Sequence, residues 1–303
     1  DFDAFVEAQK DWLEDYALYM ALKFAHDGKP FTEWGRSLRR RKKEAMDLAR
    51  ETYKEDIAFH KFIQYQFFKQ WYRLKAYANE QGISIIGDLP IYTAADSVEV
   101  WAHPELFELN VLNRPAEVAG CPPDCFSATG QLWGNPVYRW KQHRVTGYAW
   151  WIHRLGYVSK LFDMVRIDHF RGFESYYSIP AKKETAEYGA WMPGPGLELF
   201  RAAQQKLGEL NILAEDLGNI TPQVRELLAE TGYPGMKVLQ FAFDSDADNE
   251  FLPHNYTTSH CVVYTGTHDN DTLLHWAETL NREPLRFARA YLDVESRQDV
   301  PAA

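Results

Sequence analysis

The sequence predicts an α/β fold, and three observations support this class. Residues 1 to about 82 carry apolar side chains at helical spacing, and Gly28 and Gly82 end the two main patterns. After Gly82, short β-branched runs alternate with helical segments, which is typical of right-handed βαβ units and a parallel sheet. Hydrophobic residues make up 46% of the 303 residues, enough for a sizeable core.

The N-terminal segment is expected to be helical. Trp12, Tyr16 and Tyr19 recur at helical spacing, and a longer apolar pattern runs between residues 57 and 77. The basic patch at 39–43 lies between the two patterns. We interpret this patch as a solvated helix start, because the net charge of −10 argues against a nucleic-acid partner.

Five short apolar runs are predicted as buried strands, at 83–88, 163–168, 211–215, 236–243 and 260–268. The best-marked helix follows the third run. Thr221 is its expected N-cap, Pro222 its first residue, and Gly232 lies just past its end. The stretch from about 103 to 150 is rich in Pro, Gly and aromatic residues and is too long for an ordinary βα loop. Such loops commonly carry function.

The composition excludes several classes of protein. The acidic balance disfavours a nucleic-acid or anionic-membrane partner and fits a neutral substrate. An odd number of cysteines, three, makes a disulfide scaffold improbable. Since no apolar stretch approaches the roughly 20 residues of a membrane span, and the acidic start does not resemble a signal peptide, we expect a cytoplasmic protein.

Three carboxylates follow three of the predicted strands and form the candidate catalytic set: Asp168, Glu215 and Asp269. An acid at a strand end often only caps a helix or pairs with a base. Three in succession can converge on one pocket if the strands are parallel and close into a barrel. Three convergent acids suit glycosidic bond chemistry.

The neighbours of these acids suggest a role for each. Arg166 leaves its strand on the same side as Asp168, so it would favour the ionised carboxylate that a nucleophile requires. Glu215 follows an apolar strand, so partial desolvation would raise its pKa and suit it as the acid/base. Asp269, next to His268, could hydrogen-bond sugar hydroxyls and distort the ring.

A metal-dependent barrel hydrolase is the alternative that the residue types leave open. The possible ligands are His169, His268, Asp88, Asp168, Glu215 and Asp269. Asp168 and His169 are adjacent, so they would point to opposite faces of a strand. There is also no His-x-His pair, and we therefore expect a site without metal.

Aromatic residues crowd the stretch from 103 to 150 and also follow Asp168. Rings that stay partly exposed can stack on the apolar faces of glucose units. Trp133, in the segment 130–136, is expected to contact sugar. Rings outside that stretch, such as Phe170 and Phe173, are expected to serve packing.

Together, the motifs resemble those of 4-α-glucanotransferases (amylomaltase or disproportionating enzyme), glycoside hydrolase family 77 of the α-amylase clan. The matching segments are 86–92, 122–124, 130–136, 165–172, 213–218, 234–243 and 264–271, in the order of the family. The resemblance implies a (β/α)8 barrel that needs no cofactor. It also implies Asp168 as nucleophile, Glu215 as general acid/base and Asp269 as transition-state stabiliser.

The resemblance further implies the substrate contacts and the reaction. The implied contacts are Arg166, His268, Asp88, Trp133, Phe126, Asn135, His169 and Asn270. The enzyme, a hexosyltransferase, would move α-1,4-glucan segments between maltooligosaccharides, amylose or related glucans through a covalent glucosyl-enzyme. An α-1,4-glucan hydrolase with the same acids and an inactive glucan-binding fragment are the alternatives.

The five predicted strands correspond to the third to seventh of the family's barrel. Its first two strands and its last have no counterpart here, so the barrel is expected to be incomplete in this chain. Residues 1–82 would form a helical segment before the third strand, and residues 83–303 a partial catalytic barrel with a long substrate loop at about 103–150.

Overall fold

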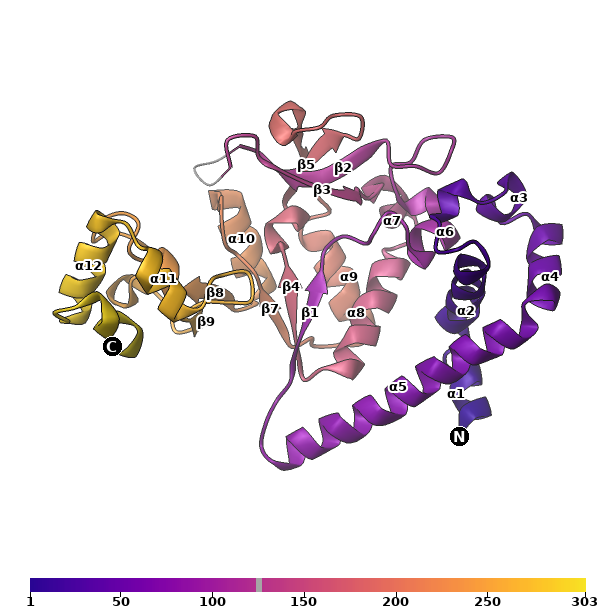
Figure 1. The fold of residues 1–303 in the computed structure, drawn as a ribbon, viewed down its shortest axis with the longest axis horizontal. Coiled ribbons are helices and arrows are strands. Elements are labelled where there is room, and N and C mark those ends of the chain that lie inside the picture. The colour runs from indigo at the N-terminus through magenta and orange to yellow at the C-terminus, as the bar shows by residue number, and fades with distance from the viewer. Residues whose placement is uncertain (124–126) are drawn as a thin grey trace. The chain divides into compact units, whose positions relative to one another are not determined.

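The computed structural model describes residues 1–123 and 127–303, and Figure 1 shows the fold. The chain forms two compact units, Asp1–Asn211 and Ile212–Ala303. Each unit combines helices with a pair of parallel strands, so the predicted α/β class is confirmed. Among the described residues, no helix has both the length and the apolar character that crossing a membrane requires.

The N-terminal part of the first unit is helical, as expected. Its helices are α1 (Phe2–Ala8), α2 (Lys10–Ala25), α3 (Arg36–Arg39), α4 (Lys43–Thr52) and α5 (Lys54–Glu80). Helix α2 packs against the long helix α5 (Figure 1) and buries Leu13, Leu18 and Leu22. Both predicted helix ends are confirmed, because Gly28 and Gly82 each adopt a φ of +75° just beyond a helix.

The basic patch is less solvated than predicted. Helix α4 does begin at Lys43, the last residue of the patch. The Arg41 guanidinium, however, lies 2.7 Å from an Asp15 carboxylate oxygen and 4.3 Å from the Trp101 ring centroid. Arg41 therefore anchors α2 and α6 (Val98–Ala102) to this corner of the unit.

A parallel strand pair forms the centre of the first unit. Strand β1 (Ile86–Pro90) pairs with β4 (Met164–Asp168), with Asp88 opposite Arg166 and Pro90 opposite Asp168. Helix α8 (Ala149–Leu161) connects back to β4 and packs on both strands, and α9 (Leu197–Leu207) packs on α8 (Figure 1). A Cβ on Gly87 would lie 2.0 Å from the Phe162 ring, so only glycine allows this close approach.

The stretch from 103 to 150 is not simply a loop. It contributes β2 (Glu117–Cys121), β3 (Gln131–Pro136) and α7 (Trp140–Val145). With β5 (Ser175–Pro180) and β6 (Ala190–Pro193), these strands form an antiparallel sheet in the order β3-β2-β5-β6. The sequence analysis missed this sheet because β2 is buried along its centre and β6 is exposed throughout, so neither strand shows apolar alternation.

The second unit repeats strand and helix along the chain. It contains β7 (Ile212–Ala214), α10 (Pro222–Thr231), β8 (Gly235–Val238), β9 (Cys261–Tyr264), α11 (Leu273–Thr279) and α12 (Arg282–Leu292). Strands β8 and β9 are parallel. The prediction for α10 is confirmed, because the Thr221 side chain accepts a hydrogen bond from the Val224 N–H and Gly232 ends the helix at a φ of +69°. The strand predicted at 236–243 ends at Val238, where a 3-10 turn begins.

Candidate active site

The β1–β4 pair carries a polar cluster, with Asp88 and Arg166 in the middle of the strands and Asp168 at the end of β4. The Arg166 Nη1 atom lies 2.7 Å from Asp88 Oδ1 and 3.0 Å from Asp168 Oδ1. The arginine side chain is 9% exposed, whereas the two carboxylates are 41% and 40% exposed. A buried guanidinium thus holds two carboxylates that still face solvent. The predicted contact between Arg166 and Asp168 is present.

Strand register produces this cluster. Residues 166 and 168 project from the same face of β4 because side chains alternate along a strand. The parallel pairing places Asp88 directly opposite Arg166. The guanidinium therefore reaches a carboxylate on its own strand and one on the neighbouring strand.

Helix α8 stabilises the end of β1 through hydrogen bonds from one arginine. Arg154, on α8, donates hydrogen bonds to the carbonyl oxygens of Pro90 at 2.7 Å and Ile91 at 3.0 Å. The buried Tyr138 hydroxyl donates to the same Ile91 oxygen at 2.7 Å. These donors satisfy carbonyls that lie at the very end of the strand, which fixes the backbone that follows Asp88. The sequence analysis did not single out Arg154.

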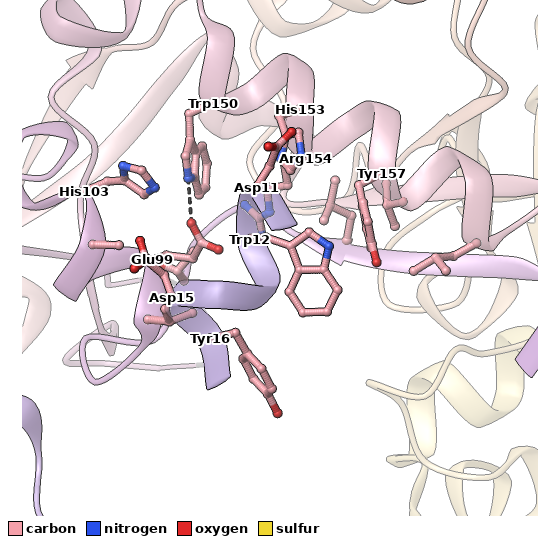
Figure 2. Close-up of a pocket in the computed structure, with 16 residues that line it drawn as sticks. Asp11, Trp12, Asp15, Tyr16, Glu99, His103, Trp150, His153, Arg154 and Tyr157 are labelled. Atoms are coloured by element: carbon pink, nitrogen blue, oxygen red, sulfur yellow. Dashed lines mark hydrogen bonds between the residues drawn. The ribbon is translucent and has the colours of Figure 1, made fainter. Parts of the chain in front are cut away.

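A cavity within the first unit lies beside Arg154 (Figure 2). It has a volume of about 370 Å³ and is lined mainly by α2, α6 and α8. Trp12 and Tyr157 meet edge to face at 5.6 Å in it, and the Trp150 indole N–H donates to Glu99 at 2.7 Å. The lining includes Leu89 and Arg154 but none of the predicted site residues. The cavity is therefore separate from the polar cluster.

His169 follows Asp168 directly but does not continue the strand. Its φ is +54°, so the argument that it points to the opposite face of a strand from Asp168 does not apply. Its ring meets the Trp133 ring edge to face at a centroid distance of 4.9 Å. Burial, together with the Arg171 guanidinium, lowers the pKa of His169 to about 3. His169 is therefore neutral at physiological pH.

The segment 130–136 carries two predicted substrate contacts, of which Trp133 meets this histidine. Trp133 is 36% exposed, so part of its ring is open to a ligand. The Asn135 amide nitrogen donates to the Thr93 carbonyl at 2.9 Å, which fixes the side chain in this segment. Phe126, the third predicted contact from this region, lies outside the described residues. The rings of Phe170 and Phe173 are fully buried, as predicted for packing residues.

Glu215 and Asp216 follow β7 in the second unit. Glu215 is partly buried, and its Oε1 accepts a hydrogen bond from the Leu217 N–H at 2.9 Å. Asp216 accepts one from the Met236 N–H at 2.7 Å, which ties the end of β7 to β8. Burial raises the pKa of Asp216. A Cβ on Gly235 would lie 2.6 Å from the Asp216 carboxylate, so this contact requires glycine there.

The loop after β9 carries the remaining predicted residues. His268 Nε2 lies 3.5 Å from Asp269 Oδ1, and the two side chains are 66% and 62% exposed. Asn270 Oδ1 accepts hydrogen bonds from the Thr267 N–H at 2.9 Å and the Thr267 hydroxyl at 3.0 Å. Asn270 thus stabilises the loop through its side-chain oxygen.

The predicted site residues therefore fall into two groups. Asp88, Trp133, Asn135, Arg166, Asp168 and His169 belong to the first unit, and Glu215, His268, Asp269 and Asn270 belong to the second. The convergence of the three acids on one sugar stays a prediction. Within residues 1–123 and 127–303, no three His, Cys, Asp or Glu side chains form a group that could hold a metal ion.

Comparisons with known proteins agree with the motifs. The sequence model of the 4-alpha-glucanotransferase family, glycoside hydrolase family 77, matches residues 1–302. The 4-alpha-glucanotransferase of Thermus thermophilus is 54% identical over 96% of this chain and 58% of its own length. That of Synechocystis is 51% identical over the same shares.

A solved structure gives the same result. The amylomaltase of Streptococcus agalactiae, determined in complex with acarbose, aligns with a TM-score of 0.95 and 43% identity. It covers 99% of this chain, and the match covers 61% of the amylomaltase. The chain thus spans less than two thirds of the length of these relatives. By sequence and by fold, this chain belongs to the 4-α-glucanotransferase family.

Proposed function

We propose that this chain carries the catalytic residues of a 4-α-glucanotransferase, which transfers α-1,4-glucan segments between maltosaccharides. The observation that carries the proposal is the Arg166 guanidinium, which holds two partly exposed carboxylates, those of Asp88 and Asp168, on the parallel pair β1–β4. Ionised carboxylates that face solvent beside a buried cation can meet an oxocarbenium-like transition state. Family membership supports this interpretation.

Asp168 is the proposed nucleophile. Its carboxylate attacks the anomeric carbon of the donor sugar as the glycosidic carbon–oxygen bond breaks, and a glucosyl ester forms. Arg166 favours the ionised carboxylate before this attack. Because Asp88 shares the same guanidinium, it fixes the arginine and indirectly the nucleophile.

Glu215 is the proposed general acid/base and Asp269 the proposed stabiliser. Glu215 gives its proton to the departing 4-oxygen and then removes the proton from the 4-hydroxyl of the acceptor. The acceptor oxygen attacks the anomeric carbon and releases Asp168, so the configuration is retained. Asp269 and His268 would hold hydroxyls of the donor sugar, and Trp133 would stack on a glucose unit.

The fold proposed for these steps is a (β/α)8-type barrel. Strands β1, β4, β7, β8 and β9 would be its third to seventh strands, with Asp168, Glu215 and Asp269 at their carboxyl ends. The helices of residues 1–82 would form a segment inserted before the third strand. The substrates would be maltooligosaccharides, amylose or related α-1,4-glucans.

Incubation with maltotriose tests the proposal. A transferase produces glucose and a ladder of longer maltosaccharides, whereas a hydrolase produces only shorter sugars. An inactive glucan-binding fragment would bind amylose but form no product. Asp168→Asn should lower the transfer rate on the order of 10⁴-fold, and Asp56→Asn, the same change at an exposed position of α5, should leave it unchanged. Equal rates for the two variants would refute the assignment.

A further inference from the structure

One residue that the sequence analysis did not single out spans the loop after β9. Gln240 follows β8 and is 8% exposed. Its backbone N–H donates to the Thr265 carbonyl at 3.2 Å, and its side-chain nitrogen donates to the Asp271 carbonyl at 2.9 Å. His268 and Asp269 lie between these two carbonyls. Gln240 therefore holds both ends of the segment that carries them.

The packing around the Gln240 amide leaves it little freedom. A Cβ on Gly266 would lie 2.5 Å from the amide nitrogen, so the loop backbone lies directly against the side chain. The loop is also closed from within, because the Asp269 N–H donates to the Thr267 hydroxyl at 3.2 Å. Since Asp269 is 62% exposed, packing contributes little to its position. Two hydrogen bonds from Gln240 to the loop backbone therefore restrain this segment.

We propose that Gln240 is a positioning residue for the transfer reaction, which holds His268 and Asp269 at the donor sugar. The inference rests on the proposed function. Gln240 does not touch the reacting atoms; it acts through the loop backbone. Position 240 requires an uncharged side chain that donates a hydrogen bond. A side chain that only accepts would leave the Asp271 carbonyl unpaired, and a charged side chain would be costly at this buried position.

Gln240→Glu gives the sharpest test. The substitution keeps the shape of the side chain, but the new side chain can donate a hydrogen bond only when its carboxyl group is protonated. The protonated acid can donate to the Asp271 carbonyl, whereas the ionised form cannot. Burial raises the pKa of a carboxyl, so the donor is recovered as the pH falls towards acid. We expect kcat of this variant, relative to the unchanged protein, to rise as the pH falls. A purely structural role would give parallel pH profiles.

Gln240→Leu removes the donor at every pH. We expect kcat for maltotriose disproportionation to fall about 100-fold, with KM nearly unchanged, because the loop acts on the transition state more than on binding. Asn255→Leu is the matched control. The Asn255 amide donates in the same unit to the Ala247 carbonyl at 2.7 Å, a partner that belongs neither to residues 239–241 nor to residues 265–271. This variant should lose stability but keep kcat.

Amide hydrogen exchange of residues 265–271 separates the inference from the proposed function. Suppose that the unchanged protein forms no maltosaccharide ladder. The proposed function then fails, and faster exchange in Gln240→Leu than in Asn255→Leu still supports the role of Gln240, whereas equal exchange overturns it. If the unchanged protein transfers glucan but Gln240→Leu keeps kcat and the Gln240→Glu profile runs parallel, only the inference is overturned.

Discussion

The ends of β4 and β9 both present a carboxylate beside a basic residue, but the two are fixed differently. Asp168 is the last residue of its strand, and the arginine beside it is almost completely buried. Asp269 lies beyond the end of β9, and both it and His268 are exposed. Strand register therefore sets the first geometry, while contacts from distant residues set the second. The position of Asp168 should therefore tolerate changes in nearby loops, whereas the position of Asp269 should be sensitive to them.

The largest effect is expected from removing the guanidinium shared by two carboxylates. Arg166→Leu leaves Asp88 and Asp168 facing each other without their cation. Unfolding free energy should fall by about 2 kcal/mol, less than for a wholly buried pair because both carboxylates are four-tenths exposed. The transfer rate should fall at least 10³-fold. Urea unfolding and maltotriose assays measure the two effects.

Arg144→Leu provides the control for this change. Arg144 forms an exposed ion pair with Glu198 at 2.8 Å, and such pairs contribute little to stability. If both leucine variants lose the same stability and activity, the first geometry does not depend on its buried arginine.

The second geometry should respond to one added methyl group. Gly266→Ala places a Cβ where the Gln240 amide lies, so the amide and the loop must separate. We expect the transfer rate to fall by about 10- to 100-fold, since displacements of this size misalign catalytic groups. Gly35→Ala, whose Cβ would meet nothing within 4 Å, should leave the rate unchanged. An active Gly266→Ala variant would show that the loop tolerates a shift.

The histidine that follows β4 should link the stability of the protein to pH. The pKa of His169 is about 3 in the folded protein, against about 6.5 in an unfolded chain. The folded state then binds fewer protons than the unfolded state between these values, so stability is lost as the pH falls from 6.5 towards 3. His169→Gln should flatten this part of the stability profile.

The stability profiles come from urea unfolding at pH values between 4 and 7. Identical slopes for His169→Gln and the unchanged protein would contradict the low pKa of His169.

The smallest effect is expected at Asp216, which joins β7 to β8. Burial raises its pKa, so the folded state holds its proton more tightly than the unfolded chain, and stability falls as the pH rises through this pKa. Asp216→Asn keeps an oxygen for the Met236 N–H and removes the buried charge. Its melting temperature should rise slightly at pH 7, and the gain should shrink at pH 4. A loss at pH 7 would show that the charge is required.

Much of the fold could be predicted because it depends on local patterns. All five strands and the helix after Thr221 were located, since apolar runs and capping residues are readable from the chain alone. The antiparallel sheet was missed because its strands depend on partners far away in sequence. The stop of β8 at Val238 was missed for the same reason, since the apolar residues after it continue into a turn.

The candidate site divides in the same way. The Arg166–Asp168 contact follows from the period of a strand and could be predicted. The positive φ of His169, the Arg154 support and the Gln240 contacts could not, because each depends on a neighbour brought in by the tertiary fold. The residues proposed to bind substrate can be read from motifs, whereas the residues proposed to position them become visible only in the structure.

Trapping the covalent intermediate tests the central claim most directly. A fluorosugar donor that forms a slowly hydrolysed glycosyl ester is incubated with the protein, and the peptides are examined by mass spectrometry. We predict a glycosyl adduct on Asp168 that is absent from Asp168→Asn. An adduct on a different carboxylate, or maltosaccharide transfer that persists in Asp168→Asn, would contradict the account.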